Sequence, residues 1–436
     1  MESRASGELA EKIFHASLRA VDPYESVKQH TEKIRAGYRD GGFRRLVVTG
    51  FGKASYWMAK AMEDYMADEI DAGIVITKYG HVGMERLKKI QVLEAGHPVP
   101  DDRGTSGTTQ VKTLLNNADN NTLVVCLISG GGSALLVSPY EGISLEDKQN
   151  ITRLLLNAGA DIYELNAVRK HISSVKGGRL AELADPAGII SLILSDVIGD
   201  RLDVIASGPT APDKTSFSDA INILEKYRLA EKTARPVFDM LNRGARHLIP
   251  ETPKDDNAVF ENVENIIIGD NKKALQAAIA EAERLGLKAE IISTEIKGEA
   301  REAGKWLAKK AAEIRREKGP GPPLCLISGG ETTVTVLGNG LGGRNMELAL
   351  SFAIAIEGTE GITLLSAGTD GTDGPTDAAG AVVTGHTTEK AVAAGLDPKE
   401  YLRNNNTYNF FKKTGGLFVT GPTGTNVTDI QILIVK

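Results

Sequence analysis

Hydrophobic residues form short runs that alternate with longer segments in which apolar positions recur at helical spacing. The short runs predict buried strands and the longer segments predict amphipathic helices. Such alternation is typical of βαβ units, in which helices cover both faces of a parallel sheet. In the first half we predict strands at 44–50, 72–78, 90–96, 122–129 and 189–195, and helices at 53–67, 103–117, 146–158 and 161–174.

The periodicity breaks around 248–260, where the sequence is polar and contains two prolines. Such a stretch indicates a domain boundary, and the length of 436 residues fits two domains at roughly 100–200 residues each. We therefore predict an α/β protein with largely parallel sheets and domains at 1–250 and 260–436. The second series contains predicted strands at 263–269, 289–293, 324–328, 332–338, 362–368, 381–385 and 430–435, and helices at 271–285, 299–318 and 344–357.

Composition narrows the class of protein. Hydrophobic residues make up 41% and charged residues 25% of the chain, which is the balance of a globular protein. The net charge of −6 lacks the basic surplus of a nucleic-acid binder. Two cysteines suit a reducing compartment, the first 20 residues do not have the layout of a signal peptide, and no apolar run is long enough to span a membrane. We expect a cytoplasmic protein without nucleic acid or membrane as partner.

Glycine is the residue in excess. The chain has 47 glycines, about 11% against a usual share of about 7%. They gather directly after predicted strands, where the carboxyl ends of an open α/β sheet bind ligands and where glycine lets the backbone approach an anion. Any one such loop can simply be a tight turn, but five of them indicate a phosphate-handling enzyme. The loops lie at 50–53, 129–133, 328–331, 338–345 and 367–374.

Two of these loops approach known nucleotide fingerprints. The loop at 50–55 is similar to the end of a Walker A motif, but Val47 and Ala54 occupy positions that require glycine and Ser or Thr. The loop at 338–343 satisfies G-x-G-x-x-G literally, with an acidic residue, Asp370, 27 residues beyond Gly343. A dinucleotide site therefore stays open as an alternative.

An identical hexapeptide, Cys-Leu-Ile-Ser-Gly-Gly, occurs at 126–131 and 325–330. We expect both copies to end an apolar strand in a turn, either as a structural repeat or by convergence. Cys126 and Cys325 are interpreted as packing residues.

Basic residues accompany the glycine loops. Lys53 and Arg344 each open a predicted helix. The positive end of the helix dipole disfavours a cation at this position, so we expect each of the two side chains to face an anion. Five basic residues, counting His171, lie between Arg169 and Arg179. Arg169, Ser173 and Lys176 share one helical face, which could line an anion pocket or be a solvated surface.

Aspartates follow two further strands, at 196 and 200 and at 370, 373 and 377. They can serve as turn residues or hold Mg²⁺, which bridges one or two carboxylates to substrate phosphates. Lysine, arginine, Mg²⁺ and backbone amides together suit phosphoryl transfer, which depends on positioning and charge neutralisation.

Several long motifs, in order along nearly the whole chain, resemble the glycerate 2-kinase family, which carries a C-terminal MOFRL domain and includes members labelled hydroxypyruvate reductase. The motifs are Ser129–Leu135, Asn166–Leu180, Leu194–Asp200, Ala206–Thr210, Ser328–Glu331, Gly343–Glu347 and Gly368–Gly374.

This resemblance implies two α/β domains, the first Rossmann-like, with the active site in the interdomain cleft. It implies ATP- and Mg²⁺-dependent phosphorylation of D-glycerate at its 2-hydroxyl, with Lys53 and Arg344 as the catalytic pair. Asp196, Asp200 and Asp370 are the candidates for base or metal ligand, an inference from their chemistry that the resemblance does not fix. Among them we expect Asp196 to be catalytic, and Asp200 and Asp370, with Asp373, to bind the metal. A homodimer is a further expectation. The predicted nucleotide- and phosphate-binding residues are Ser129, Gly130, Gly131, Gly132, Ser133, Lys176, Gly177, Glu331 and Asn345.

Two other functions stay open from the residues alone. One is an NAD(P)H-dependent hydroxypyruvate reductase, which would use the glycine fingerprint at 338–343. The other is a non-catalytic module that senses a nucleotide or sugar acid.

Overall fold

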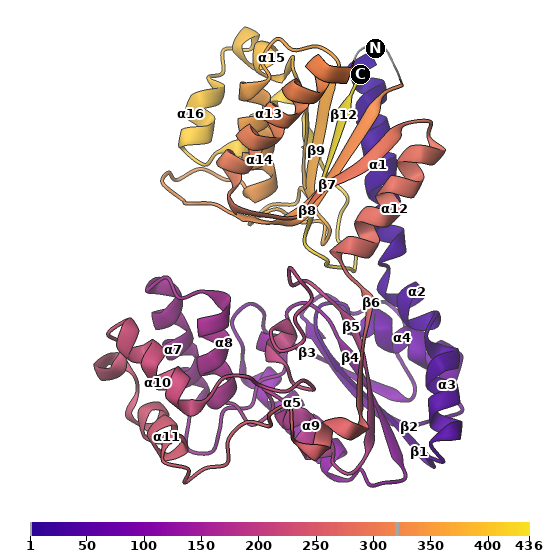
Figure 1. Ribbon diagram of the computed structural model, residues 1–436, viewed down its shortest axis with the longest axis vertical. Coiled ribbons are helices and arrows are strands. Elements are labelled where there is room, and N and C mark those ends of the chain that lie inside the picture. Colours follow the sequence, from indigo (N-terminus) through magenta and orange to yellow (C-terminus); the bar gives the residue numbers. More distant parts are fainter. Residues whose placement is uncertain (1, 319–321) are drawn as a thin grey trace. The chain divides into compact units, whose positions relative to one another are not determined.

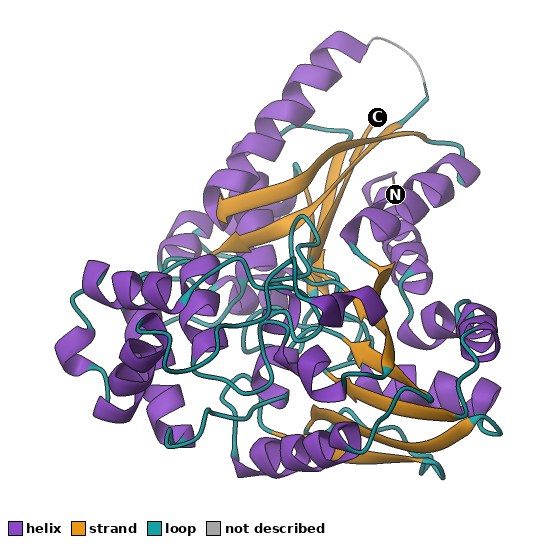
Figure 2. Cartoon of the chain, turned by 60° about the horizontal axis from the view of Figure 1, so that its bottom comes forward, coloured by secondary structure: helices purple, strands orange, loops and turns teal. Residues whose placement is uncertain are grey.

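The computed structural model describes residues 2–318 and 322–436. Two compact units are present (Figure 1). The first unit comprises Pro23–Ile268, and the second comprises Met1–Asp22 together with Gly269–Lys436. Helices flank the strands of both units in Figure 2. No helix in the described part of the chain is long and apolar enough to cross a membrane.

The first unit is built on a six-stranded sheet with the order β3-β2-β1-β4-β5-β6. The pairs β1·β2, β1·β4, β2·β3 and β4·β5 are parallel. This is the strand order of a Rossmann fold, in which the order reverses between the first and fourth strands. The strands are β1 (Arg45–Phe51), β2 (Ile70–Lys78), β3 (Ile90–Ala95), β4 (Thr122–Ile128), β5 (Gly188–Leu194) and β6 (Val263–Gly269).

Hydrophobic cores cover this sheet, and a further core lies within a group of four helices, α7, α8, α10 and α11 (Figure 1). Phe217 and Leu241 are among the residues buried in the helical group. The helices of the first unit are α2 (Pro23–Lys28), α3 (Thr31–Asp40), α4 (Ser55–Met66), α5 (Asp102–Asn116), α6 (Gly132–Leu135), α7 (Leu145–Asn157), α8 (Ile162–His171), α9 (Arg179–Ala184), η1 (Ile205–Ser207), α10 (Phe217–Lys226), η2 (Ala230–Lys232), α11 (Arg235–Ala245) and η3 (Ala258–Asn262).

The second unit also has a six-stranded sheet, in the order β11-β10-β9-β12-β8-β7. Core residues from α1 and α12 form one cluster, and those from α13 and α14 form another. Its strands are β7 (Lys288–Glu299), β8 (Leu324–Thr333), β9 (Ile362–Gly368), β10 (Gly380–Thr384), β11 (Leu417–Phe418) and β12 (Asp429–Val435). Its helices are α1 (Glu2–Ala20), α12 (Asn271–Arg284), α13 (Ala300–Lys318), α14 (Arg344–Ala355), α15 (Thr387–Ala393), α16 (Pro398–Arg403) and α17 (Thr407–Thr414).

The two-domain α/β class is confirmed, but the second sheet is mixed. Only β7·β8 is parallel, whereas β12 is antiparallel to β8 and β9, and β10 is antiparallel to β9 and β11. Consequently β7, β8, β9 and β11 run one way while β10 and β12 run the other. One reason is that 369–379, between β9 and β10, contains no helix and is short for a parallel crossover.

The division of the chain differs from the expected boundary at 248–260. Strand β6 still belongs to the first sheet, where Asn265 Nδ2 donates to the carbonyl of Thr210 at 3.0 Å. Helix α1 belongs to the second unit because its apolar face is buried there. Phe14 lies edge-on to Phe418, with 5.3 Å between ring centroids. The chain therefore leaves the second unit after α1 and returns to it after β6.

The two copies of the repeated hexapeptide adopt different structures. The copy at 126–131 leaves β4 after Ile128 and turns, as expected. The copy at 325–330 stays in strand, because β12 pairs with it as far as Gly330. The expectation of a turn at both copies was wrong, and 332–338 forms no separate strand. Both cysteines are buried, and burial raises the pKa of the Cys325 thiol to about 12, which supports their interpretation as packing residues.

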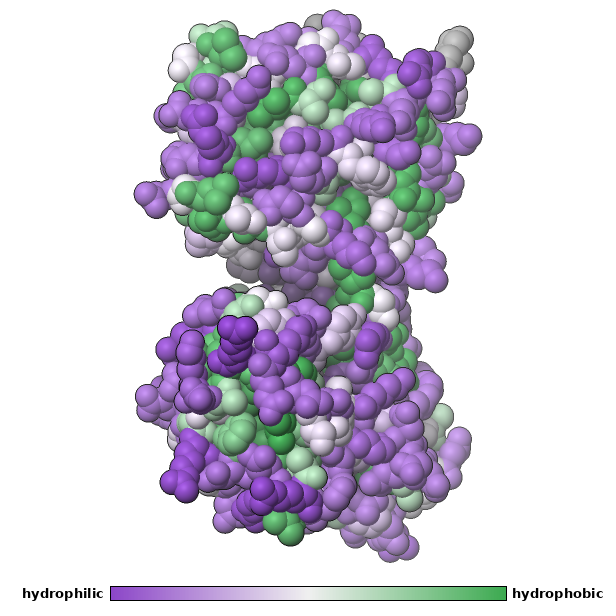
Figure 3. Space-filling model, turned by 60° about the vertical axis from the view of Figure 1, so that its left-hand side comes forward, coloured by the Kyte–Doolittle hydropathy of each residue, from purple (hydrophilic) through white to green (hydrophobic). Residues whose placement is uncertain are grey.

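Hydrophilic residues predominate on the face shown in Figure 3, and the hydrophobic ones form scattered patches.

Candidate active site

Lys53 lies at the carboxyl end of β1, on a loop locked to the loop that follows β4. Its backbone N–H donates to the carbonyl of Gly130 at 2.8 Å, and the N–H of Ala54 donates to Ser129 Oγ at 3.1 Å. Gly52 permits this approach, since its φ is +136° and a Cβ there would lie 2.1 Å from Ser129 Oγ. The hydroxyl oxygen of Ser129, predicted to bind phosphate, therefore helps to join the two loops.

The loop 129–133 presents backbone amides beside the stem of Lys53. Gly131 has φ +84°, and a Cβ there would lie 3.3 Å from Lys53 Cγ. Within the described residues, the N–H groups of Gly130 and Gly131 donate to no protein acceptor. Successive free amides of this kind form an anion-binding concavity. Their place between β1 and β4 is the switch point at which open α/β sheets bind ligands.

The remaining residues of this loop hold a neighbouring turn. The N–H of Gly132 donates to the carbonyl of Ser129 at 3.2 Å, and Ser133 Oγ lies 2.7 Å from Ser207 Oγ. Gly177 adjoins the same turn, because its N–H donates to the carbonyl of Ser207 at 3.0 Å. Ser133 and Gly177 are thus brought together, with Ser207 as their common neighbour, and a Cβ at Gly132 would lie 2.9 Å from the Cβ of Ala206 in the same turn.

Asp196 and Asp200 follow β5, which lies next to β4 in the sheet. Since parallel strands end at the same edge, Lys53, the loop 129–133 and Asp196 lie at one edge of the first unit. Both aspartates are partly exposed, and Asp200 has a left-handed φ of 52°.

Lys176 is buried, and its Nζ lies 3.4 Å from the carbonyl of Ala206. Burial lowers the pKa of Lys176 well below its ordinary value, and the charges of Lys148 and Arg169 lower it further. Lys148, on α7, was not among the predicted site residues. It falls on the buried face of that helix with Ile151 and Leu155, at i, i+3 and i+7. A lysine in that pattern is the sequence signal that would have found it.

His171 and Ser173, in the same segment, have structural roles. His171 is buried, with Nδ1 2.7 Å from the carbonyl of Ala167 and Nε2 2.9 Å from Glu251 Oε1. Ser173 Oγ donates to the carbonyl of Ser138 at 3.3 Å, which assigns it to local structure.

In the second unit, Arg344 opens α14 and forms a two-pronged ion pair with Asp429. Its Nε lies 2.6 Å from Asp429 Oδ2 and its Nη2 lies 2.8 Å from Oδ1. Its Nη1 lies 3.1 Å from Glu331, so Glu331 pairs with this guanidinium. Burial lowers the pKa of Arg344 because it disfavours the charged guanidinium. The nearby carboxylates, Asp429 foremost, have the larger combined effect, so the pKa is raised overall. Asp429 was not among the predicted site residues, and its one signal in the sequence is a carboxylate at the start of an apolar strand.

Asp373 and Asn345 are buried at the start of α14. Asp373 Oδ1 accepts the N–H of Asn345 at 3.0 Å, and Oδ2 accepts the N–H of Met346 at 2.8 Å. Ser366 Oγ donates to Asn345 Oδ1 at 2.7 Å. Burial raises the pKa of Asp373 to about 7, against these two backbone hydrogen bonds. Asp373 therefore caps the helix, and its two oxygens are already engaged.

Asp370 lies in the turn that follows β9. Its Oδ1 accepts hydrogen bonds from the N–H and Oγ1 of Thr372, both at 3.1 Å, and its side chain is partly exposed. In the described part of the chain, no three His, Cys, Asp or Glu residues are grouped so that they could hold a metal ion. Mg²⁺ needs only one or two protein carboxylates beside substrate phosphates. Asp200 and Asp370 fit that requirement, and Asp373 does not.

The glycine fingerprint at 338–343 has a packing role. A Cβ at Gly338 would lie 2.2 Å from Asn404 Oδ1, one at Gly340 would lie 2.4 Å from Asn406 Cβ, and one at Gly342 would lie 2.2 Å from the Oγ1 of Thr407. The loop thus packs on 404–407, and Asp373 occupies the start of the helix that follows. Residues 334–337 separate the fingerprint from β8, whereas the glycines of a dinucleotide site directly follow a strand.

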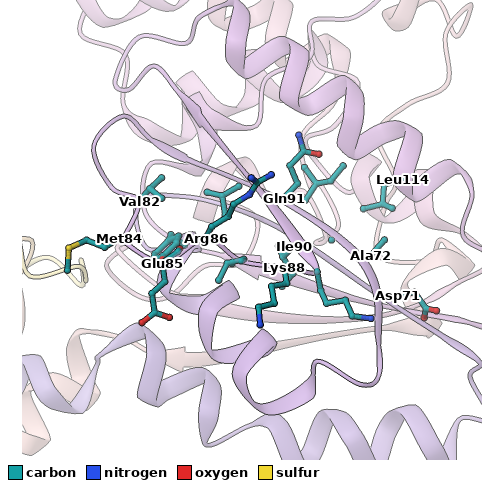
Figure 4. Close-up of a pocket in the computed structure, with 17 residues that line it drawn as sticks. Asp71, Ala72, Val82, Met84, Glu85, Arg86, Lys88, Ile90, Gln91 and Leu114 are labelled. Carbon is teal, nitrogen blue, oxygen red and sulfur yellow. The ribbon is translucent and has the colours of Figure 1, made fainter.

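A cavity of about 830 Å³ lies in the first unit, between the segment 82–92 and the start of β2 (Figure 4). It lies toward the amino end of β2, opposite to the carboxyl ends that bind ligands in such sheets. Asp71 and Leu114 are among its lining residues, and none of the predicted site residues lines it.

Comparison with known proteins shows similarity over both units. Residues 9–242 match a family described as a domain of unknown function (DUF4147), and residues 324–429 match the MOFRL family. The chain is 47% identical to the D-glycerate 2-kinase of Thermotoga maritima over 98% of both proteins, and 45% identical to the glycerate 2-kinase of Pyrococcus horikoshii over 98% of this chain and 97% of that one. A crystal structure of a glycerate kinase from Thermotoga maritima matches with a TM-score of 0.89 at 46% identity, covering 99% of this chain and 100% of that one.

Proposed function

The chain belongs to the glycerate 2-kinase family that carries a MOFRL domain, and on this premise we propose that it transfers the γ-phosphoryl group of ATP to the 2-hydroxyl of D-glycerate. The products are 2-phosphoglycerate and ADP. The observation that carries the proposal is the identity with a D-glycerate 2-kinase over nearly the whole of both chains. The loops at the carboxyl ends of β1 and β4 support it independently, since they supply a lysine and free amides at the switch point of the sheet.

For phosphoryl transfer the protein must hold the attacking and the leaving oxygen in line with the phosphorus atom. It must also stabilise the charge on the transferring group. We assign this task to Lys53 together with the amides of Gly130 and Gly131. Fixed donors of this kind need no reorganisation during the reaction, which is why they stabilise a transition state more than water does. The bond from Lys53 N–H to the carbonyl of Gly130 fixes the lysine relative to the amides.

Asp196 is the proposed general base. It would accept the proton of the 2-hydroxyl as that oxygen bonds to phosphorus and the γ-phosphoryl group leaves the β-phosphate of ATP. Its partly exposed place after β5, on the sheet edge that carries Lys53, supports this role.

Arg344 is the proposed second catalytic cation, contacting the glycerate carboxylate or the transferring group. Asp429 is a positioning residue, because its two contacts at 2.6 and 2.8 Å hold the plane of the guanidinium. The side chain of Arg344 keeps 32% of its surface exposed, which leaves part of it accessible to an anion.

When bound with the nucleotide, Mg²⁺ would neutralise charge on the phosphate oxygens. Asp200 of the first unit and Asp370 of the second unit are the two candidate carboxylates for holding it. The cytoplasmic location and the homodimer stay predictions.

A nicotinamide-dependent reductase is not favoured, because the glycines at 338–343 pack against 404–407. Purified protein with hydroxypyruvate and NADH or NADPH should leave the absorbance of the cofactor unchanged. A steady fall in that absorbance, dependent on hydroxypyruvate, would restore the alternative.

The test of the kinase is ADP release, measured by a coupled assay with ATP, Mg²⁺ and D-glycerate. We expect ADP release to depend on D-glycerate, since closure around both substrates keeps water from the γ-phosphate. The proposal fails if no ADP appears, or if ADP appears at the same rate without D-glycerate. A sensing module would bind these ligands without turnover.

A further inference from the structure

A buried cluster of three cations lies in the first unit, beside the turn that contacts the phosphate-binding loop. Lys148 comes from α7, Arg169 from α8, and Lys176 from the segment after α8. Lys148 is 3% exposed and Lys176 is fully buried, while Arg169 is partly exposed. We name these three residues the basic cluster.

The basic cluster has no carboxylate partner in the described part of the chain. The Nζ of Lys148 is buried without a hydrogen-bond partner, and the Nζ of Lys176 reaches only the carbonyl of Ala206, at 3.4 Å. Arg169 takes part in none of the ion pairs of the described residues. Neighbouring basic residues differ in this respect. Lys170 Nζ lies 3.1 Å from Asp213 and His171 Nε2 lies 2.9 Å from Glu251.

A purely structural role accounts poorly for this arrangement. Burying a charge without a partner costs free energy, and a second and third like charge nearby add to the cost. Burial and the nearby Arg169 lower the pKa of Lys148 to about 7. The first unit would be more stable with apolar residues at these positions, so the cost indicates that something absent from the chain compensates it.

The surroundings of the cluster show where that compensating group would lie. Ser207 Oγ donates to Asn166 Oδ1 at 2.9 Å, and Asn166 is one helical turn before Arg169 on α8. Ser207 also contacts Ser133, the last residue of the loop with the free amides. Ala206 and Ser207 have left-handed φ values of 51° and 63°, a conformation that costs non-glycine residues free energy. The turn at Ala206 and Ser207 therefore has a strained backbone. Ser207 holds it by hydrogen bonds to Asn166, on the side of the basic cluster, and to Ser133, on the side of the phosphate-binding loop.

We propose that Lys148, Arg169 and Lys176 form an oxyanion site that binds one anionic group of a substrate. The group is a compact oxyanion, either the carboxylate of D-glycerate or a phosphate of ATP, since both present the oxygen acceptors that ammonium and guanidinium donors bind. This inference rests on the proposed function for the identity of the substrates, but not for the existence of the site.

The test compares wild-type protein with Lys148→Met and Lys176→Met, which remove a charge and keep a long side chain. Lys226→Met is the matched control, because Lys226 belongs to the same helical group but lies at the surface, paired with Glu164. Binding of D-glycerate, ATP and inorganic phosphate is measured by isothermal titration calorimetry, so that the result does not depend on turnover. Thermal unfolding of each variant is measured in parallel.

We expect each cluster variant to weaken binding of one substrate at least about tenfold, equivalent to about 1.4 kcal/mol, without lowering the melting temperature. A specific loss for D-glycerate assigns the site to the carboxylate, and a loss for ATP and inorganic phosphate assigns it to phosphate. Lys226→Met should bind as the wild type does.

Two results would overturn the proposal. One is unchanged binding of all three probes by both folded cluster variants. The other is a clear fall in melting temperature with unchanged affinity, which would identify the cluster as structural. Absence of kinase activity in a wild-type protein that still binds these anions would instead refute the proposed function alone.

Discussion

The basic cluster predicts that anion binding takes up protons. In the free protein burial and Arg169 hold the pKa of Lys148 at about 7. A bound oxyanion supplies the missing opposite charge, so it should raise this pKa towards the ordinary value of about 10.4. Binding at pH 8 then protonates a lysine that was mostly neutral.

The magnitude follows from this pKa. A group with a pKa of about 7 is about 10% protonated at pH 8, so complete protonation on binding takes up about 0.9 proton. Lys176, whose pKa lies well below its ordinary value, can add up to one further proton. Between pH 8 and 9 the affinity should therefore fall by about tenfold or more.

The assay is calorimetric titration of the anion at pH 8 in two or more buffers that differ in heat of ionisation. The observed enthalpy changes linearly with that heat, and the slope is the number of protons taken up. We expect a slope of about one to two protons for the wild type, and a slope smaller by about one for Lys148→Met. A slope of zero, or proton release, would refute this reasoning.

The same pKa fixes the sign of a stability change. Because the pKa of Lys148 is lower in the folded than in the unfolded state, the unfolded state binds more protons between about pH 7 and 10.4. The free energy of unfolding should therefore rise with pH across this window, and the stability so gained is lost again as the pH falls from about 10.4 to about 7. Lys148→Met should abolish this part of the pH dependence and stabilise the protein at pH 7, by at most about 4 kcal/mol.

Three further substitutions test the site. Lys53→Ala should lower kcat at least about 100-fold with an unchanged melting temperature, because it removes a donor to the transferring group; equal kcat values in wild type and variant would contradict its catalytic role. Gly52→Ala should lower the free energy of unfolding, measured in urea, by about 1–3 kcal/mol. The reason is that the φ of +136° disfavours alanine and that Ser129 leaves no room for a methyl group. An unchanged free energy of unfolding would refute this structural role of Gly52. Asp429→Asn should lower kcat/KM by releasing the guanidinium of Arg344, with the amide keeping the fold; an unchanged pH profile and kcat/KM would remove its positioning role.

Much of the fold follows from periodicity, because local patterns decide which segments are strands and which are helices. The strand predicted at 122–129 is β4, at Thr122–Ile128, and the helix predicted at 103–117 is α5, at Asp102–Asn116. Tertiary pairing is not visible in such patterns. The hexapeptide at 325–330 stays in strand because β7 pairs with it on one side and β12, about 100 residues later, pairs with it on the other.

The candidate site likewise has features that local sequence patterns predict and features that depend on tertiary contacts. Five of the loops could be predicted from the sequence, because clusters of glycine mark them. Lys148 was missed although it lies on the buried face of α7, since a single lysine in a helical pattern is usually solvated. Asp429 was missed because its partner, Arg344, is 85 positions away in the sequence. Asp373 was predicted to bind metal, but the start of α14 uses both its oxygens.

The most direct test of the central claim is phosphorus NMR of the product formed from ATP, Mg²⁺ and D-glycerate. We expect 2-phosphoglycerate, in an amount equal to the ADP released. Formation of 3-phosphoglycerate, or of inorganic phosphate without either ester, would contradict it.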